Sequence, residues 1–511
     1  MDSTRTDKAA YILITLYVVF LVFFGWKFHP IENIHSPEND GYVAKADLIR
    51  QGHIPKDPYH PLLYPLLTAG AGSLLDDTFA GGRLVSSLFA GVLILFTYLL
   101  SRRYFSRKVG IFAALGLMLN QHIIIEGVHA AGDITFTALT TLVLYLCVGI
   151  LDHLDYRAVP TLALAFSAAF LVRYQAVLLL PIIIIALCYS PSLTVKKRAI
   201  ALMIFAAAMV LFLMPHFYLS MRMFGSPLYN ENWKNLAFRQ YGGGDFSYYD
   251  RTPFHGWMSV ITSSPRAVFL STAKELMHFI HFGITDLAGG QTAGGLLVAA
   301  SLFGAYNCLV QPCPRNSLIF SWLAIYIIGI TGTYFTWSRY MLPILPLGYI
   351  LAGSFIFSGA FQGDLAIRKH HIRGSMFIAV ILLFMLAGTT LNALPGFIKR
   401  HPVKEVETAV ALQNEYGSGL RVLGTYPFSG RHVKYWYEEL ERFHADECGN
   451  EIAYYKRLGD IIRRERIDYL IIGKMTLNDR PTSLLSGSGT PSFLSPIIRN
   501  EDVTVYKIIT R

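Results

Sequence analysis

The residues of this 511-residue sequence that could do chemistry stand where apolar stretches begin or end. Asp40 lies in a polar stretch, and Asp133 opens an apolar run. Arg173 and Arg339 lie beside other apolar runs, and a Tyr follows each of them. A carboxylate within reach can take the proton of a hydroxyl, and a guanidinium binds phosphate oxygens through a planar fork of donors. An acid and an arginine at one place could therefore activate a hydroxyl beside an anionic headgroup.

The elements that must position these residues are membrane-spanning helices. Apolar residues make up 53% of the chain and charged residues 15%, where a soluble domain carries about 25% charged residues. The mean hydropathy is +0.41. These values exclude a disordered chain and argue against a typical cytosolic enzyme.

Eleven stretches approach the roughly 20 mainly apolar residues that a helix needs to cross a bilayer. The fifth and sixth are short and separated only by Arg173, so they form either a tight hairpin or one broken helix. With the hairpin, the sequence predicts a polytopic α-helical membrane protein with about 11 transmembrane helices. The stretches are 9–28, 84–100, 109–125, 134–151, 158–172, 174–190, 199–220, 289–311, 317–337, 340–360 and 374–392.

Lys and Arg sort the connecting loops into two sides. Loops 101–108, 191–198 and 361–373 are short and basic, whereas loop 126–132 has no Lys or Arg. Because basic loops stay cytoplasmic, we expect a multi-pass protein of the plasma (inner) membrane with its C-terminus outside. The net charge of +10 fits these loops and gives no reason to expect a nucleic-acid partner.

The chain is expected to form two domains. Residues 1–394 make a transmembrane domain with long outer loops at 28–83 and 221–288. Residues 395–511 are more polar and predict a small α/β extracytoplasmic domain. Its expected elements are strands at 421–426, 469–473 and 503–508 and a helix over 451–465.

This topology brings acids and bases from distant parts of the chain to the outer membrane face. A charge at the middle of the bilayer costs roughly 2.5–3.5 kcal/mol on insertion scales, so charges normally stop at span ends. Each residue alone therefore also fits a structural role, and Asp40 could simply cap the helix that follows it. An Asp is too short to snorkel far, which makes the acids harder to explain in this way than the arginines. The outer-face candidates are Asp40, Glu126, His129, Asp133, Arg173 and Arg339.

Three stretches carry recognisable motifs. The first is NDGY at 39–42 with HPLLYP downstream at 60–65. The second is the run 82–146, with an Arg-Leu opening, a basic turn containing Phe, and a lone Asp. The third is the pair of Arg-Tyr motifs at 171–181 and 338–346. Together, in this order, they resemble the polytopic GT-C class of glycosyltransferases, and more narrowly family 39 with its protein O-mannosyltransferase and aminoarabinose-transferase relatives.

In that family the sugar donor is a polyprenyl or dolichyl phosphate. The resemblance implies that Asp40 is the catalytic base and Asp133 a second acid of the same site. It also implies that Arg173 and Arg339 meet the lipid phosphate. A direct displacement with an Asp base would invert the anomeric centre and transfer the sugar to a hydroxyl of a protein, lipid or glycan acceptor. The substrate-binding candidates around these residues are Tyr42, His60, Tyr64, Arg83, Glu126, His129, Trp233 and Tyr340.

The sequence gives no sign of a metal site. The first outer loop has no Asp-x-Asp motif, and the five cysteines are scattered without metal-ligand spacing. We therefore expect no required cofactor, although a divalent cation stays open.

Two other functions compete with sugar transfer. A transporter or flippase would place charges at mid-membrane and often shows inverted repeats, whereas here the charges lie at span ends and no repeat is evident. The other is a non-catalytic scaffold or a polymerase of lipid-linked glycans. A polymerase would share the outer-face site, so the sequence separates it poorly from the transferase. The sequence does not identify the sugar.

Overall fold

The computed structural model describes the helical part of the chain at residues 3–28, 41–153, 155–189, 194–241, 252–310, 313–358, 364–367 and 370–398. In the tail it describes residues 408, 411–412, 415, 421–424, 434–435, 458–460, 462–464, 466–473, 492–499 and 503–509. All structural features below lie in these residues.

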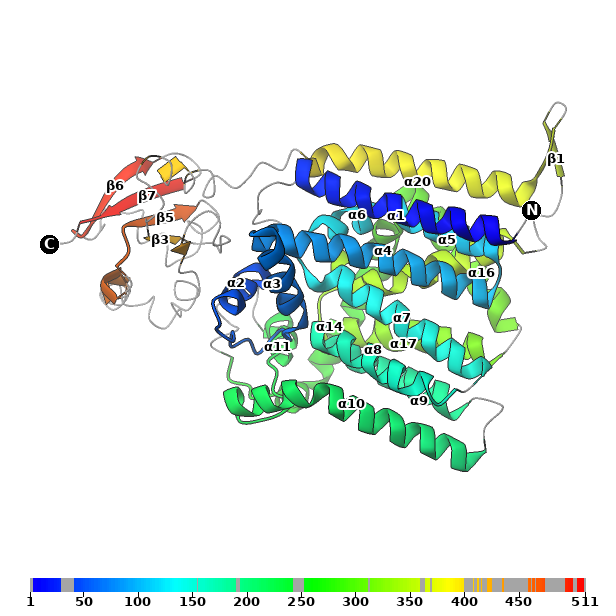
Figure 1. The fold of residues 1–511 in the computed structure, drawn as a ribbon, viewed down its shortest axis with the longest axis horizontal. Helices are drawn as coiled ribbons and strands as arrows, with labels where there is room; N and C mark the ends of the chain where they lie inside the picture. Colours follow the sequence, from blue (N-terminus) through cyan, green and yellow to red (C-terminus); the bar gives the residue numbers. More distant parts are fainter. Residues whose placement is uncertain are drawn as a thin grey trace.

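Within the described residues, eight helical segments are long and apolar enough to cross a bilayer, and Figure 1 shows them packed as one bundle. This confirms a polytopic α-helical membrane protein. The segments are α1 (Ser3–Phe28), α4 (Thr78–Tyr104), α7 (Gly132–Asp152), α10 (Val195–Phe224), α16 (Gln291–Val310), α17 (Pro314–Thr333), the run of α18 (Ser338–Met341), η4 (Leu342–Ile344) and α19 (Leu345–Ile356), and α20 (Gly374–Ile398).

The remaining three predicted spans are helical but bent or short. The stretch 109–125 falls on α5 (Arg107–Met118) and α6 (Gln121–Val128), which meet at 61°. The next two fall on α8 (Ala158–Val172), which has only 15 residues, and on η2 (Tyr174–Leu179) followed by α9 (Leu180–Cys188). Arg173 interrupts them because its backbone is extended, with φ −148° and ψ 133°. By length and composition, the described residues hold eight spans, or nine if the bent pair is one.

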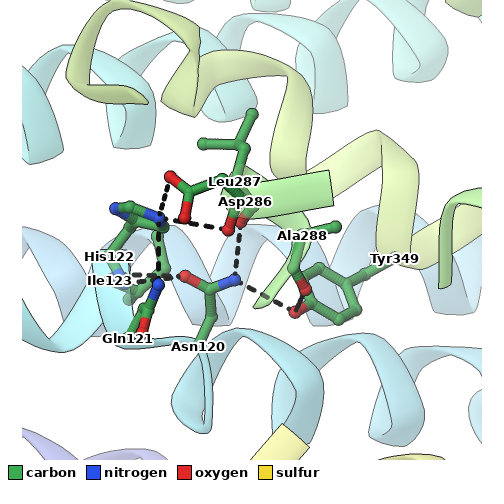
Figure 2. A network of polar contacts seen from close by, with 8 residues as sticks. All are labelled: Asn120, Gln121, His122, Ile123, Asp286, Leu287, Ala288 and Tyr349. Atoms are coloured by element: carbon green, nitrogen blue, oxygen red, sulfur yellow. Dashed lines mark hydrogen bonds and ion pairs between the residues drawn. The ribbon is translucent and has the colours of Figure 1, made fainter. Parts of the chain in front are cut away.

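A polar network holds the bend between α5 and α6 (Figure 2). Asn120 Oδ1 accepts hydrogen bonds from the N–H groups of His122 (2.9 Å) and of the next residue (3.3 Å), which caps α6. Its Nδ2 donates to the carbonyl oxygen of Leu287 (2.9 Å) and to the hydroxyl of Tyr349 (3.2 Å). The bend is therefore tied to α15 (Ile284–Gly289) and to α19, and these contacts fix where α6 begins.

Two short helices, α2 (Tyr42–Arg50) and α3 (Leu63–Leu75), form the first of the two regions that the sequence predicts to lie outside the membrane, here called the first and second outer regions. They pack on the start of α4. The α3 and α4 backbones approach so closely that a Cβ on Gly81 would lie 2.3 Å from the backbone nitrogen of Gly72. Only glycine, which has no Cβ, fits there. Asp77 caps α4 by accepting a hydrogen bond from the Ala80 N–H at 3.1 Å.

The second outer region consists of α11 (Trp233–Tyr241), α13 (Trp257–Ser263), α14 (Pro265–His278) and a π-helical turn, η3 (Phe279–Gly283), that leads into α15. In Figure 1, α11 lies at the same end of the bundle as α2 and α3. The two outer regions therefore meet at one end of the helical body.

The described strands form two sheets. A hairpin of β1 (Asp364–Ile367) and β2 (His370–Arg373) precedes α20. The tail sheet has the order β4-β3-β5-β7-β6, with β3 parallel to β4 and β5, and β7 antiparallel to β5 and β6. Three of its strands match the predicted ones, whereas β4 and β6 were not predicted. Residues 458–460 and 462–464 of the predicted helix are helical, and the division of the chain at residue 394 stays a prediction. The tail strands are β3 (Arg421–Gly424), β4 (Lys434–Tyr435), β5 (Tyr469–Gly473), β6 (Leu494–Arg499) and β7 (Val503–Ile508).

Candidate functional site

A small polar cavity lies where the two outer regions meet the ends of the membrane helices. Its volume is about 150 Å³. Its walls come from the turn before α3, the start of η2, the start of α11, the end of α17, and α18. Every lining side chain carries a polar group, so the cavity suits a polar ligand. The lining residues are Tyr59, His60, Arg173, Gln175, Asn232, Asn235, Tyr334 and Tyr340.

Arg173 reaches the cavity wall paired with Asp133. Arg173 Nη2 lies 2.7 Å from Asp133 Oδ1, and the two residues are 4% and 2% exposed. Asp133 stands in the first turn of α7, where the partial positive charge of the helix end favours an acid. A buried charge needs such a partner, because burial of either one alone is costly. The structure thus places Asp133 as the residue that holds the Arg173 guanidinium in place.

Tyr340 brings the two predicted arginines together. The centre of the Arg339 guanidinium lies 4.8 Å from the centroid of the Tyr340 ring, and that of Arg173 lies 5.2 Å from it. Arg339 Nη2 also donates to the Tyr340 hydroxyl at 2.9 Å. Cations at such distances are attracted to an aromatic face. Two Arg-Tyr motifs that lie far apart in the sequence therefore form one cationic and aromatic wall.

A carboxylate that the sequence analysis missed, Asp57, organises the part of the cavity wall that carries Tyr59 and His60, here called the His60 wall. Its side chain is 6% exposed and forms an ion pair with Lys45. Its Oδ2 accepts a hydrogen bond from His60 Nδ1 at 3.0 Å, and its Oδ1 accepts from the backbone N–H groups of Tyr59 (2.7 Å) and His60 (3.1 Å). Burial raises the pKa of this carboxyl, but Lys45 and His60 outweigh burial and hold the pKa well below its usual range. Asp57 thus fixes the turn that brings Tyr59 and His60 to the cavity.

The predicted base, Asp40, lies outside the described residues. Gly41, which is joined to it, starts α2 with a left-handed φ of 73°. Tyr42, the next residue, is fully buried, and its ring centroid lies 5.1 Å from that of His60. A Cβ on Gly132 would come within 3.3 Å of the Tyr42 hydroxyl oxygen. The start of α2 is therefore packed against the residue that precedes Asp133.

Arg339 touches the cavity wall only through Tyr340, and the other predicted site residues do not line the cavity. Tyr64 is buried and its hydroxyl bonds within the protein, to the Gly82 carbonyl oxygen (3.0 Å) and to Ser86 Oγ (2.9 Å). The Arg83 guanidinium lies 5.2 Å from the Phe79 ring centroid. Glu126 and His129 are a buried pair 3.7 Å apart, and Trp233 packs on Leu236 and Val260. The substrate-binding roles of these residues and of Tyr64 stay predictions.

Five lining residues were missing from the sequence prediction: Tyr59, Gln175, Asn232, Asn235 and Tyr334. Each stands within a few positions of a predicted residue, but amides and tyrosines beside a span also occur as ordinary interface residues. Among the described residues, no group of three or more His, Cys, Asp or Glu side chains could hold a metal ion.

Residues 59–218 match the family model of dolichyl-phosphate-mannose-protein mannosyltransferase. A search of curated protein sequences finds no match. The fold is similar to that of ArnT from Cupriavidus metallidurans, in the apo state and bound to undecaprenyl phosphate. Both comparisons give a TM-score of 0.64 and 13% identity; the first covers 99% of this chain and 98% of ArnT, and the second 97% of each.

The fold is also similar to that of the archaeal oligosaccharyltransferase AglB from Archaeoglobus fulgidus, solved with an inhibitory peptide and a dolichol-phosphate. Here the TM-score is 0.57 at 12% identity, over 92% of this chain and 69% of AglB. At such low identity these likenesses show the fold alone. Together with the family match, they confirm the resemblance that the motifs indicate: this chain has the GT-C fold of the ArnT type, and its residues 59–218 resemble the family 39 mannosyltransferases.

Proposed function

We propose that this protein transfers a sugar from a polyprenyl-phosphate donor to an acceptor hydroxyl at the outer face of the membrane. The observation that carries the proposal is the cluster of Arg173, Tyr340 and Arg339, in which Arg173 and Tyr340 line a polar cavity and Arg339 lies against the Tyr340 ring. Guanidiniums bind phosphate oxygens and stay charged near a membrane. Supporting it, ArnT was solved with undecaprenyl phosphate and AglB with a dolichol-phosphate.

Each residue has a role in this proposal. The guanidiniums of Arg173 and Arg339 stabilise the charge that develops on the leaving phosphate. Asp133 holds Arg173 against the cavity and does not itself exchange a proton. Asp40 removes the proton of the acceptor hydroxyl while that oxygen bonds to the sugar C1. The C1–O bond to the phosphate breaks at the same time, so the anomeric centre is inverted and the lipid phosphate leaves.

The test is the variant Asp40→Asn, which removes a base without changing its size. Purified protein is given a panel of radiolabelled polyprenyl-phosphate sugars together with a cell-envelope extract as acceptor. We expect the transfer rate to fall about a hundredfold or more, since a general base contributes about 10²–10⁴-fold. Binding of the lipid donor should change little.

The matched control is Asp76→Asn. Asp76 is an outer-region carboxylate whose side chain is 99% exposed and which pairs with Arg50 on the surface, 3.1 Å away. The Asp76→Asn variant should transfer sugar at the rate of the unmodified protein. Full transfer by Asp40→Asn would remove Asp40 from the mechanism, and no transfer from any lipid donor by the unmodified protein would refute the proposed function.

A further inference from the structure

One short segment of the second outer region, residues 231–241, crosses between the two walls of the cavity. We call it the strap; it consists of α11 and the two residues before it. Asn232 and Asn235 line the cavity, and Arg239 lies four positions further on. This spacing places the three side chains on one face of the strap. Trp233, Leu236 and Ala237 lie on the other face and pack on Val260 of α13.

The first end of the strap is bonded to the turn that carries His60. The backbone N–H of Glu231 donates to the carbonyl oxygen of Pro58 at 3.0 Å. Asn232 Nδ2 donates to the carbonyl oxygen of Tyr59 at 3.3 Å. The Lys234 ammonium lies 6.0 Å from the centroid of the Tyr59 ring. This end therefore follows the wall that Asp57 organises.

The other end of the strap is bonded to the C-terminus of α17. Arg239 Nη1 donates to the carbonyl oxygens of Thr331 and Tyr334, both at 2.6 Å, and Nη2 donates to that of Gly332 at 3.2 Å. The last carbonyls of a helix have no partner within the helix, and a cation is stabilising there. Tyr334 follows α17 directly and lines the cavity, and its ring centroid lies 5.7 Å from that of Tyr340.

A second contact fixes the same stretch of backbone. Glu275 of α14 accepts hydrogen bonds from the N–H (3.3 Å) and the hydroxyl (2.9 Å) of Thr336. Arg239 Nη2 also reaches the hydroxyl of Thr272, one turn earlier on α14, at 3.4 Å. The residues between α17 and Arg339 are thus held by two side chains of the second outer region.

We propose that Arg239 is a positioning residue for donor binding: through the strap it sets where Tyr334, Tyr340 and Arg339 stand relative to the His60 wall. This inference rests on the proposed function, because it takes the lipid phosphate as the ligand of that wall. Arg239 acts only through the carbonyls it holds. Its loss should move the phosphate-binding wall and weaken donor affinity more than the chemical step.

The experiment compares the unmodified protein with Arg239→Gln, Arg239→Lys and Thr336→Val, each purified as the full chain. Affinity for undecaprenyl phosphate is measured directly, and KM and kcat are measured with a transferable polyprenyl-phosphate sugar. We expect Arg239→Gln to weaken carrier affinity and raise the donor KM about tenfold, with kcat within about threefold, since charged hydrogen bonds are lost. Arg239→Lys should recover part of the affinity, and Thr336→Val should lose about two- to threefold.

The control is Arg222→Gln, which removes an exposed arginine of α10 that lies over Tyr218; it should bind the carrier normally. Should Arg239→Gln fail to fold, Arg239→Lys and Thr336→Val carry the test. Unchanged carrier affinity in the folded variants, or an equal fall in kcat with no rise in KM, overturns the inference. A protein that binds undecaprenyl phosphate but transfers nothing refutes the proposed function alone, and one that does not bind it overturns both.

Discussion

At the scale of single residues, Tyr340 and Asp57 organise the two sides of the cavity in different ways. Tyr340 lies against the guanidiniums of Arg173 and Arg339, so it concentrates positive charge on one wall. The buried Asp57 carboxylate is compensated by Lys45 and His60, so an internal ion pair holds the wall that carries His60. An anion would be drawn to the first wall.

Asp57→Asn tests the second wall. The variant keeps an oxygen for the two backbone N–H groups but places an amide against Lys45 and His60. We expect it to lower the unfolding free energy by roughly 3 kcal/mol, because it removes the carboxylate from a largely buried ion pair. Thermal unfolding in detergent measures this change.

The same variant has a pH signature. The pKa of Asp57 is lower in the folded protein than the ordinary value near 3.9 of an unfolded chain. Its stabilisation is therefore fully present above about pH 4 and is lost as the pH falls towards the folded-state pKa. The stability difference between the unmodified protein and Asp57→Asn should shrink as the pH is lowered through this range. A difference that stays constant with pH would contradict the ion-pair account.

At the scale of elements, the close approach of α3 to α4 leaves no room for a larger side chain at Gly81. A Cβ on Gly81 would lie 2.3 Å and 2.7 Å from backbone atoms of Gly72, which cannot rotate away. Gly81→Ala should cost about 1–3 kcal/mol of unfolding free energy through overpacking. The matched control is Gly70→Ala on α3, where a Cβ meets nothing within 4 Å. Gly70→Ala should leave the unfolding free energy unchanged or raise it slightly. Equal changes in unfolding free energy for the two variants would contradict the close packing of α3 on α4.

Hydropathy was enough to place the helices and the break at Arg173, but not the bend after α5. A run of about 20 apolar residues favours a membrane-spanning helix whatever other segments pack against it. All eleven predicted segments therefore fall on helices. The bend after α5 depends on Asn120, whose partners Leu287 and Tyr349 stand more than 160 positions away. No local pattern carries that information. The role of Asp57 could not be predicted either, because its ion-pair partner Lys45 belongs to another element.

At the scale of the whole molecule, topology predicted part of the site. Topology placed Arg173 at the outer face, and the family resemblance added His60 and Tyr340 as candidates. The structure places these three residues around one cavity. Asp133 was expected there as an acid, and it is paired with Arg173. The polar residues of the strap could not be predicted, because Asn232 and Asn235 reach the cavity only through the packing of α11 on α13.

The small mixed sheet of the tail lies beyond the end of the bundle that carries α2 and α3 in Figure 1. Two parallel and two antiparallel pairings hold it together.

The most direct test of the account is a cryo-electron microscopy structure of the full-length protein with undecaprenyl phosphate. The account predicts phosphate oxygens about 3 Å from guanidinium nitrogens of Arg173 or Arg339, beside the Tyr340 ring. A phosphate bound away from these two arginines, with the cavity filled only by solvent, would contradict it.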